Sequence, residues 1–349
     1  MLLAGDVGGT HIRLGRFRLG AEGRVRAVGE PVDFRSRDYP DLATAAVEFV
    51  AGESLEAACF GIPGPVRNNQ AKTTNLPWPE LDGDAIGARL GLPAGRSLLV
   101  NDLAAAAAGL DDLEPDQLLT LQGGEQEEEE GARGNRALVS AGTGLGVALE
   151  TRVGERWATL ATEGGHADFA ARDEEEWALS GYLAERFGRE SGGHVSAERL
   201  VSGPGLVNLY EFLRDRRGFP AHPTVERALS DKAAGIPGKD PSAAIAEIGA
   251  AEDSPICDRT LSMFCSIYGA VAGNVALGAG ATGGVFLGGG VAPKVRDRLA
   301  GGEFLRSFLA KGRFAGYLSR IAVKIVLEPH AGLLGAAKLA AQAATQQSI

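Results

Sequence analysis

Two glycine-rich segments of the chain have the composition of phosphate-binding turns. Residues 5–10 read GDVGGT and residues 142–146 read GTGLG, and each lies between an apolar run and a second extended stretch. An unobstructed backbone can direct several N–H groups into one concavity, which is how such loops hold phosphate. For either loop alone, a tight turn that needs positive φ is an equally good explanation.

The extended chain after each loop excludes two common nucleotide-binding motifs. A dinucleotide-binding loop opens a helix after a strand, whereas both loops here lead back into extended chain. No GxxxxGK[ST] motif occurs, so a P-loop is excluded as well. The remaining interpretation is an ATP held between two glycine hairpins.

Asp6 lies within the first glycine segment. A carboxylate at this position would repel a phosphate group unless a divalent cation lies between them. Mg²⁺ prefers few carboxylates together with water and substrate phosphates. Asp6 is therefore predicted to anchor Mg²⁺.

The Asn101-Asp102 pair stands where a short apolar strand ends and an alanine-rich helix begins. Both residue types favour the N-cap of a helix, and capping alone would explain the pair. A carboxylate at the end of a strand is also well placed to accept a proton from a hydroxyl within about 3 Å. The pair by itself does not decide between these interpretations.

Residues 163–166 read EGGH and combine a carboxylate, two small residues and an imidazole. One interpretation is a turn with a hydrogen-bonded histidine; the other is a group that binds a polyol. Carboxylates accept from sugar hydroxyls, imidazole can donate, and glycines permit close approach. Glu198 fits the surface of a helix that begins at Ser196.

Elements of alternating or helical periodicity must position these residues. The strand–glycine turn–strand pattern occurs once in each half, which suggests a duplicated architecture. Strands are predicted within residues 2–17, at 57–62, 97–100, 137–139 and 147–151, and helices at 43–50, 103–110 and 332–342.

Composition indicates a soluble protein of two domains. The chain has 349 residues and a net charge of −10, which argues against a partner with a phosphate backbone.

Residues 263–293 carry no charge, but their glycines favour a buried helix, a turn and a buried strand over a membrane span. The three cysteines lack metal-binding spacing and are expected to be buried thiols in a reducing cytoplasm. The acidic run at 125–130 is expected to be a solvated loop.

Taken together, these motifs resemble the bacterial glucokinases of the hexokinase/actin-like ATPase superfamily. The matches follow one another over almost the whole chain. They are residues 5–10, 101–102, 142–146, 163–166, 194–199 (HVSAER), 202–210 (SGPGLVNLY), 283–290 (GGVFLGGG), 311–314 (KGRF) and 329–335 (PHAGLLG).

The resemblance implies two lobes with RNase H-like α/β sheets that close over a central cleft. The expected domains are a small one, residues 1–111 with a C-terminal helix at 327–349, and a large one, residues 112–326. It implies transfer of phosphate from ATP, with Mg²⁺, to the 6-hydroxyl of glucose, by a cytoplasmic homodimer. The implied sugar contacts are Asn101, Asp102, Glu163, His166 and Glu198, with Asp102 as the base. The implied nucleotide contacts are Asp6, Gly8, Gly9, Thr10, Gly142, Thr143, Gly144, Gly288, Gly289 and Gly290.

Two features depart from the family pattern. His11 stands where an Asn is expected, and the acidic run at 125–130 has no counterpart in the family. The cysteine-rich zinc motif of the related repressor/kinase branch is absent from the sequence, which points away from that branch. A kinase for another hexose, an actin-like ATPase switch without sugar turnover and a sugar-responsive regulator are the alternatives. The set of polyol-binding residues distinguishes a kinase from a switch.

Overall fold

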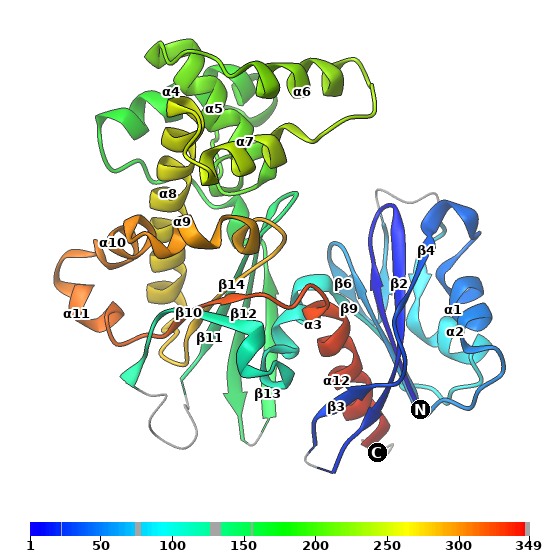
Figure 1. Cartoon of the computed structure of the whole chain (residues 1–349). Helices are drawn as coiled ribbons and strands as arrows, with labels where there is room; N and C mark the ends of the chain where they lie inside the picture. Colours follow the sequence, from blue (N-terminus) through cyan, green and yellow to red (C-terminus); the bar gives the residue numbers. More distant parts are fainter. Residues whose placement is uncertain (22, 74–77, 126–133, 155, 346–349) are drawn as a thin grey trace. The chain divides into compact units, whose positions relative to one another are not determined.

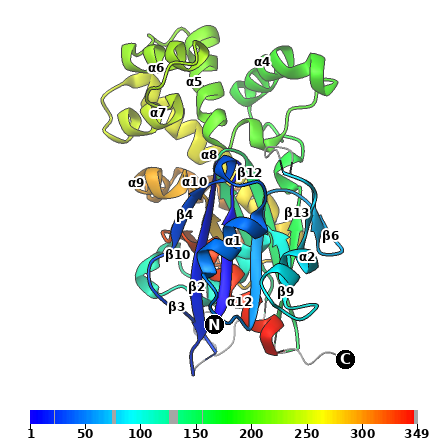
Figure 2. The same ribbon diagram turned by 90° about the vertical axis from the view of Figure 1, so that its right-hand side faces the viewer.

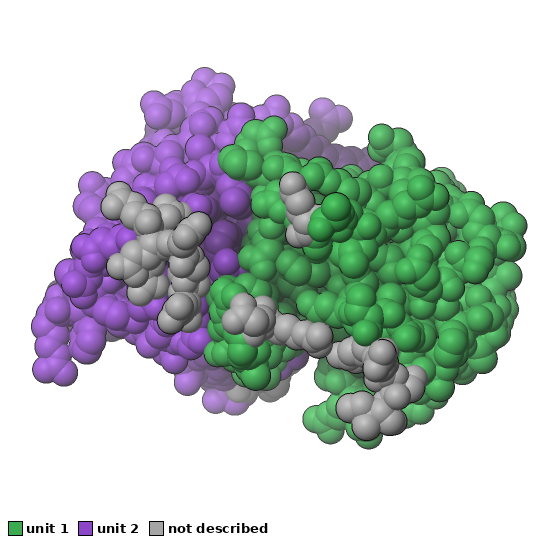
Figure 3. Space-filling model, turned by 90° about the horizontal axis from the view of Figure 1, so that it is seen from below, with its two compact units in different colours: residues 1–117, 148–161, 328–349 green, residues 118–147, 162–327 purple. Residues whose placement is uncertain are grey.

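The computed structural model describes all residues except 22, 74–77, 126–133, 155 and 346–349. The chain divides into two compact units (Figures 1 and 3). Unit 1 comprises Met1–Gln117, Ala148–Ala161 and Glu328–Ile349, and unit 2 comprises Leu118–Val147 and Thr162–Leu327. Apart from Glu125, the acidic run predicted to be a surface loop lies outside the described residues.

The main sheet of unit 1 begins with the predicted strand–glycine turn–strand. Its order is β3-β2-β1-β5-β9, and β4 also pairs with β2. β1 is antiparallel to β2 and parallel to β5, and β5 is parallel to β9. Its strands are β1 Leu2–Val7, β2 His11–Leu19, β3 Val25–Ala27, β4 Val32–Arg35, β5 Ala57–Ile62 and β9 Ser97–Asn101. A small sheet is formed by β6 Val66–Arg67, β7 Gln70–Ala71 and β8 Leu81–Asp82.

Helices cover both faces of the unit 1 sheet (Figures 1 and 2). α1 (Leu42–Val50) and α2 (Gly83–Arg89) bury their apolar residues against one face. α12 (Ala331–Thr345) covers the other face and packs on α3 (Asp102–Ala108). The two helices approach closely because Gly335 lacks a side chain: a Cβ there would lie 1.6 Å from the Ala105 carbonyl oxygen.

The second six-stranded sheet, whose strands β10, β11, β14 and β15 lie in unit 2, repeats the strand order of the main sheet of unit 1. It runs β10-β15-β14-β11-β12-β13, so β13-β12-β11-β14-β15 corresponds to β3-β2-β1-β5-β9. β11, β14 and β15 are parallel, and β10 is antiparallel to β15. The strands are β10 Leu118–Gln122, β11 Arg136–Ala141, β12 Leu145–Val153, β13 Arg156–Thr162, β14 Val285–Gly288 and β15 Val323–Val326. This common order supports the predicted duplication.

The uncharged segment at 263–293 forms a buried helix, a turn and a buried strand, as predicted. α8 (Pro255–Ala279) is long and apolar enough to cross a membrane, but 61% of its most apolar window is buried inside the protein. It packs on α10, α7, α5 and β11. The other helices of unit 2 are α4 Glu174–Ser191, α5 Gly203–Arg217, α6 Pro223–Ala233, α7 Pro241–Ala250, α9 Arg296–Ala300, α10 Glu303–Leu309 and α11 Ala315–Leu318.

Short 3-10 helices connect many of these elements. They are η1 Ser36–Asp38, η2 Leu110–Asp112 and η3 Pro115–Gln117 in unit 1, and η5 Gly164–His166, η6 Ala197–Arg199, η7 Ala292–Val295 and η8 Gly312–Phe314 in unit 2. The three cysteines are free and buried, as predicted. Burial raises the pKa of the Cys265 thiol to about 12.

Candidate active site

The carboxyl edge of the parallel strands in unit 1 brings three of the predicted site residues together. Asp6 of β1 is level with Gly61 of β5, and Gly61 is level with Val100 of β9. Neighbouring strands lie about 4.8 Å apart, so Asp6 is roughly 10 Å from Val100 across the sheet. Asn101 and Asp102 follow Val100 directly, at the same edge.

Asn101 is the N-cap of α3, which confirms the capping interpretation for this member of the pair. Its Oδ1 accepts from Leu103 N at 3.0 Å and Ala104 N at 3.2 Å, and its Nδ2 donates to the Gly64 carbonyl at 3.1 Å. Asp102 is the first residue of the helix, half-buried, and its Oδ1 accepts from Leu103 N at 2.9 Å. These bonds use both ends of the Asn101 amide, so Asn101 fixes the backbone that presents Asp102.

The Asp6 carboxylate is half-buried. Burial is the main influence and raises its pKa, while the nearby Arg13 and His330 oppose that shift. Arg13 is itself bound by Asp33, at 2.7 Å and 2.8 Å, and contacts His330 Nδ1 at 3.0 Å. Among the described residues, none forms a hydrogen bond or an ion pair within 4 Å with the side chain of Asp6.

This environment fits a Mg²⁺ ligand. A half-buried carboxylate that forms no direct hydrogen bond or ion pair with the described residues gains stability when a divalent ion binds. The described residues contain no cluster of three or more acidic, His or Cys side chains that could hold a metal. One carboxylate with water and phosphate oxygens is the coordination that Mg²⁺ accepts in nucleotide sites.

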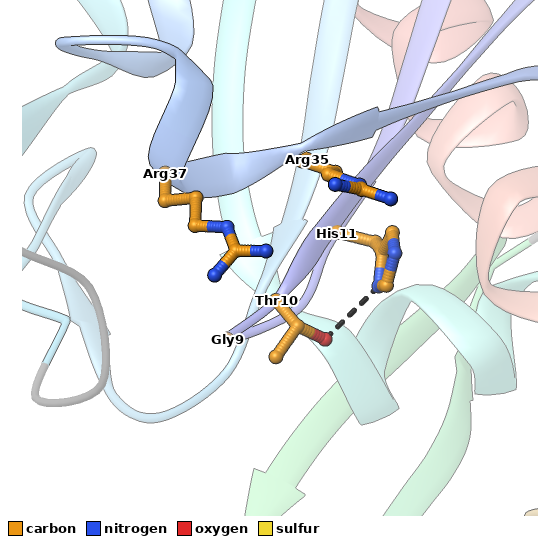
Figure 4. Close-up of a pocket in the computed structure, with 5 residues that line it drawn as sticks. All are labelled: Gly9, Thr10, His11, Arg35 and Arg37. Atoms are coloured by element: carbon orange, nitrogen blue, oxygen red, sulfur yellow. Dashed lines mark hydrogen bonds between the residues drawn. The ribbon is translucent and has the colours of Figure 1, made fainter.

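The first glycine turn joins β1 to β2. Its glycines do not have the positive φ that would explain their presence in a tight turn. Gly8 is absent from the positive-φ residues among those described, and its N–H donates to the His11 carbonyl at 2.8 Å. The His11 ring, in place of the expected Asn, turns back to the Thr10 hydroxyl, with Nδ1 to Oγ1 at 3.0 Å. Gly9, Thr10 and His11 line one side of a cavity (Figure 4).

The second glycine turn joins β11 to β12. Its Gly144 is needed because the side chain of Glu198 packs against the turn. Gly142 and Gly144 also lack positive φ, so that explanation is wrong here too. A Cβ on Gly144 would lie 2.4 Å from Glu198 Oε2, and the same oxygen accepts from Leu145 N at 2.9 Å. The glycine therefore admits the Glu198 carboxylate against the turn.

A cavity of about 410 Å³ in unit 2 joins two of the predicted nucleotide segments. It is lined by Gly142 and Thr143 of the second turn and by Gly290 after β14. Gly289, by contrast, is required by packing: its φ is +80°, and a Cβ would lie 2.3 Å from the Ala141 carbonyl oxygen. A Cβ on Gly288 would lie 2.9 Å from a methyl carbon of the Leu138 side chain.

The same cavity contains polar residues that the sequence did not reveal. They are Lys232, Asp240, Ser242 and Lys294. Lys232 Nζ donates to Asp240 at 2.9 Å, and Asp240 caps α7 through Ser242 N, also at 2.9 Å. An Asp before a Pro marks the start of a helix in the sequence, but nothing local indicates that this helix faces the glycine turn.

The three predicted polyol-binding residues of unit 2 lie together. His166 is 3.9 Å from Glu163 and 3.9 Å from Glu198, through different ring nitrogens. Glu163 and His166 are exposed and Glu198 is half-buried. The alternative that placed Glu198 on an ordinary helix surface is wrong, because Glu198 belongs to the single turn η6 and accepts from Leu145 N. Ser196 makes no side-chain cap.

A His194–Asp168 pair contacts the backbone of the Glu163, His166 and Glu198 group through His194, although the sequence analysis gave neither member of the pair a role. His194 Nδ1 is 2.7 Å from the Asp168 carboxylate, and Nε2 is 3.0 Å from the His166 carbonyl oxygen. Both partners only accept, so both bonds form together only when both ring nitrogens carry hydrogen. His194 thus tethers the backbone of His166.

Comparison with known proteins shows similarity to glucokinases. The glucokinase family model matches residues 3–343. A glucokinase of Trichormus variabilis is 38% identical, over 98% of this chain and 99% of its own. A glucokinase structure from an Antarctic psychrotroph is 28% identical, with a TM-score of 0.78 and 98% of each chain covered. A ROK family glucokinase from Streptomyces griseus, solved with glucose and AMPPNP, is 22% identical, with a TM-score of 0.60, 98% of this chain and 99% of that one covered, and shows the shared fold.

Proposed function

The chain belongs to the glucokinase family, and on that premise we propose which of its residues perform the reaction. A glucokinase transfers the γ-phosphoryl group of ATP to the 6-hydroxyl of glucose and yields glucose 6-phosphate and ADP. The observation that carries the assignment is the edge of the unit 1 sheet, where Asp102 follows β9 and Asp6 is the penultimate residue of β1. We assign Asp102 as the base and Asp6 as the metal anchor.

Asp102 would accept the proton of the sugar hydroxyl as the new bond to phosphorus forms. Its position is supported by Asn101, which caps α3 and holds the Gly64 carbonyl. One hydrogen of the Asn101 amide is left for a sugar oxygen, because an amide nitrogen carries two. Asn101 can therefore contact glucose while it positions the base.

The nucleotide would be held by its phosphates at the two glycine turns and by its adenosine in the 410 Å³ cavity beside Gly290. Phosphoryl transfer depends mainly on positioning and on stabilisation of charge. When bound at Asp6, Mg²⁺ would neutralise part of the triphosphate charge. The AMPPNP in the Streptomyces griseus structure supports ATP as the donor.

Glucose would be bound in unit 2 by Glu163, His166 and Glu198. The His166 imidazole, 3.9 Å from each of the two carboxylates, offers a donor, and the carboxylates offer acceptors, to neighbouring ring hydroxyls. The glucose in the Streptomyces griseus structure supports this sugar as the substrate. We further propose a cytoplasmic homodimer without nucleic-acid or membrane partners, on the family resemblance and the net charge of −10.

A panel of donors and sugars tests the substrate assignment. ATP and polyphosphate are each assayed with glucose, mannose, fructose, N-acetylglucosamine and N-acetylmannosamine. We expect ATP with glucose to give the highest kcat/KM, at least about tenfold above the acetylated sugars, because the site lacks room for an N-acetyl group and a polar group left unpaired by the poor fit costs about 1–3 kcal/mol. Comparable kcat/KM for an acetylated sugar would indicate a hexosamine kinase, and ATP hydrolysis that ignores sugar would indicate an ATPase switch.

Asp6→Asn is expected to raise the Mg²⁺ concentration for half-maximal activity by roughly tenfold or more, with little change in the affinity for glucose. Burial raises the pKa of Asp6 in the folded protein. The ionised carboxylate therefore lowers the free energy of unfolding at neutral pH, and this loss of stability disappears as the pH falls through that pKa. Without metal, the Asp6→Asn variant should be at least as stable at pH 7 as the parent. Mg²⁺ titrations at fixed ATP and thermal melts measure both effects.

The exposed Asp116 of η3 provides a matched control, since Asp116→Asn removes a charge from the same unit. An Asp6→Asn enzyme with the parental Mg²⁺ dependence would show that Asp6 is only a turn residue.

A further inference from the structure

Three basic side chains beside the first glycine turn have no part in the reaction described above. His11 of β2 and Arg35 of β4 are paired in register, and Arg37 follows in η1. Together with Gly9 and Thr10 they line a cavity of about 320 Å³. Figure 4 shows Arg35 beside the His11 ring and the guanidinium of Arg37 turned toward Thr10.

The two arginines differ from the other arginine on this part of the sheet. Arg13 is engaged by Asp33 through two hydrogen bonds. Within the part of the chain that the structure describes, neither Arg35 nor Arg37 makes a hydrogen bond or an ion pair, and both are exposed. Two guanidinium groups without acidic partners around one cavity repel each other, and an anion between them removes that repulsion.

Arg35 also lies on the face of the sheet that carries Asp6. Asp6 is paired with Arg13, Arg13 with Asp33, and His11 with Arg35. Residues paired across strands, and residues two apart on one strand, point to the same face of a sheet. The distance from Arg13 to His11 along β2 is about 7 Å. A phosphate chain whose cation is held at Asp6 can therefore extend along this face to Arg35 and the cavity that Arg37 also lines.

We propose that Arg35, Arg37 and His11 form a subsite for a phosphate dianion next to the Gly8–Thr10 turn. The planar fork of arginine binds two phosphate oxygens at once. The Nδ1 atom of His11 is used by Thr10, and Nε2 is its remaining polar atom. The proposal rests on the proposed function in one respect: the dianion is taken to be the terminal phosphate of the nucleotide. Free inorganic phosphate has the same chemistry.

Binding of tripolyphosphate to the full chain, without metal or glucose, tests the subsite independently of turnover. Calorimetry compares the parent with Arg35→Gln, Arg37→Gln and the double variant. We expect the double variant to bind about tenfold more weakly, because two charge-assisted contacts are lost. Replacing both arginines by Lys, which keeps the charges but loses the fork, should restore part of the affinity.

Arg18→Gln is the matched control, because Arg18 is an exposed arginine of the same strand, seven residues from His11. It should bind tripolyphosphate like the parent. In steady-state assays, the double variant should show a KM for ATP raised by a similar factor and an unchanged KM for glucose.

Inorganic phosphate distinguishes the two sources of the anion. Inhibition that is competitive with ATP and lost in the double variant identifies the terminal phosphate of the nucleotide. Inhibition that is non-competitive with ATP and lost in the double variant identifies a site for free phosphate and overturns the nucleotide assignment.

Equal tripolyphosphate affinity in the parent and the double variant overturns the subsite and leaves two solvated arginines, even if glucose is phosphorylated normally. If the parent does not phosphorylate glucose but binds tripolyphosphate through these arginines, the proposed function fails and the subsite stands.

Discussion

Replacing Asp102 by Asn is expected to lower kcat by roughly 10² or more, while glucose still binds. The variant keeps the size of the side chain and an oxygen that can accept from Leu103 N, as Asp102 Oδ1 does at 2.9 Å. An amide cannot take up the proton of the sugar hydroxyl. The loss should therefore fall on turnover, with the fold and the sugar affinity preserved.

Steady-state kinetics gives kcat for this variant, and calorimetry gives its affinity for glucose. Asp84→Asn is a matched control, because Asp84 is also a carboxylate in the first turn of a unit 1 helix and is exposed. It should have parental kinetics. Near-normal kcat in Asp102→Asn would contradict the assignment of the base and leave Asp102 as a residue of the helix start.

Gly165→Ala is expected to lower kcat/KM for glucose by roughly 10²-fold, the cost of a misplacement of about 1 Å. A Cβ at Gly165 would lie 1.8 Å from the Leu145 carbonyl oxygen. Backbone cannot yield to this contact as a flexible side chain can, so η5 must move away from β12. Because His166 belongs to η5 and Glu198 is bonded to Leu145 N, that movement separates the proposed glucose contacts.

The same substitution should also reduce stability by about 1–3 kcal/mol, the usual cost of overpacking. Gly181→Ala in α4 is the control: a Cβ there has no atom within 4 Å, so Ala should stabilise the helix by about 0.5–1 kcal/mol. Thermal melts and glucose titrations of both variants measure these effects. A Gly165→Ala enzyme with parental kcat/KM would show that packing against Leu145 does not hold the sugar group in place.

Local patterns in the sequence determined most elements that carry the site. The strand predicted at 57–62 is β5 in full, and the predicted helix at 332–342 lies within α12. Such elements follow from alternation, helical periodicity and glycine content, which depend on near neighbours in the chain. The repeated strand–turn–strand units also lie where the sequence places them, because each is a local hairpin.

Only the tertiary structure shows which contacts require particular residues at the site. The glycines of the two glycine turns suggested positive φ, but Gly144 instead makes room for Glu198, which is 54 residues away in the chain. Glu198 resembled an ordinary helix residue until the fold placed it against Leu145. Register across β2 and β4 likewise sets Arg35 beside His11. These contacts join segments that are distant in the sequence, and periodicity within one segment carries no information about which other segment will pack against it.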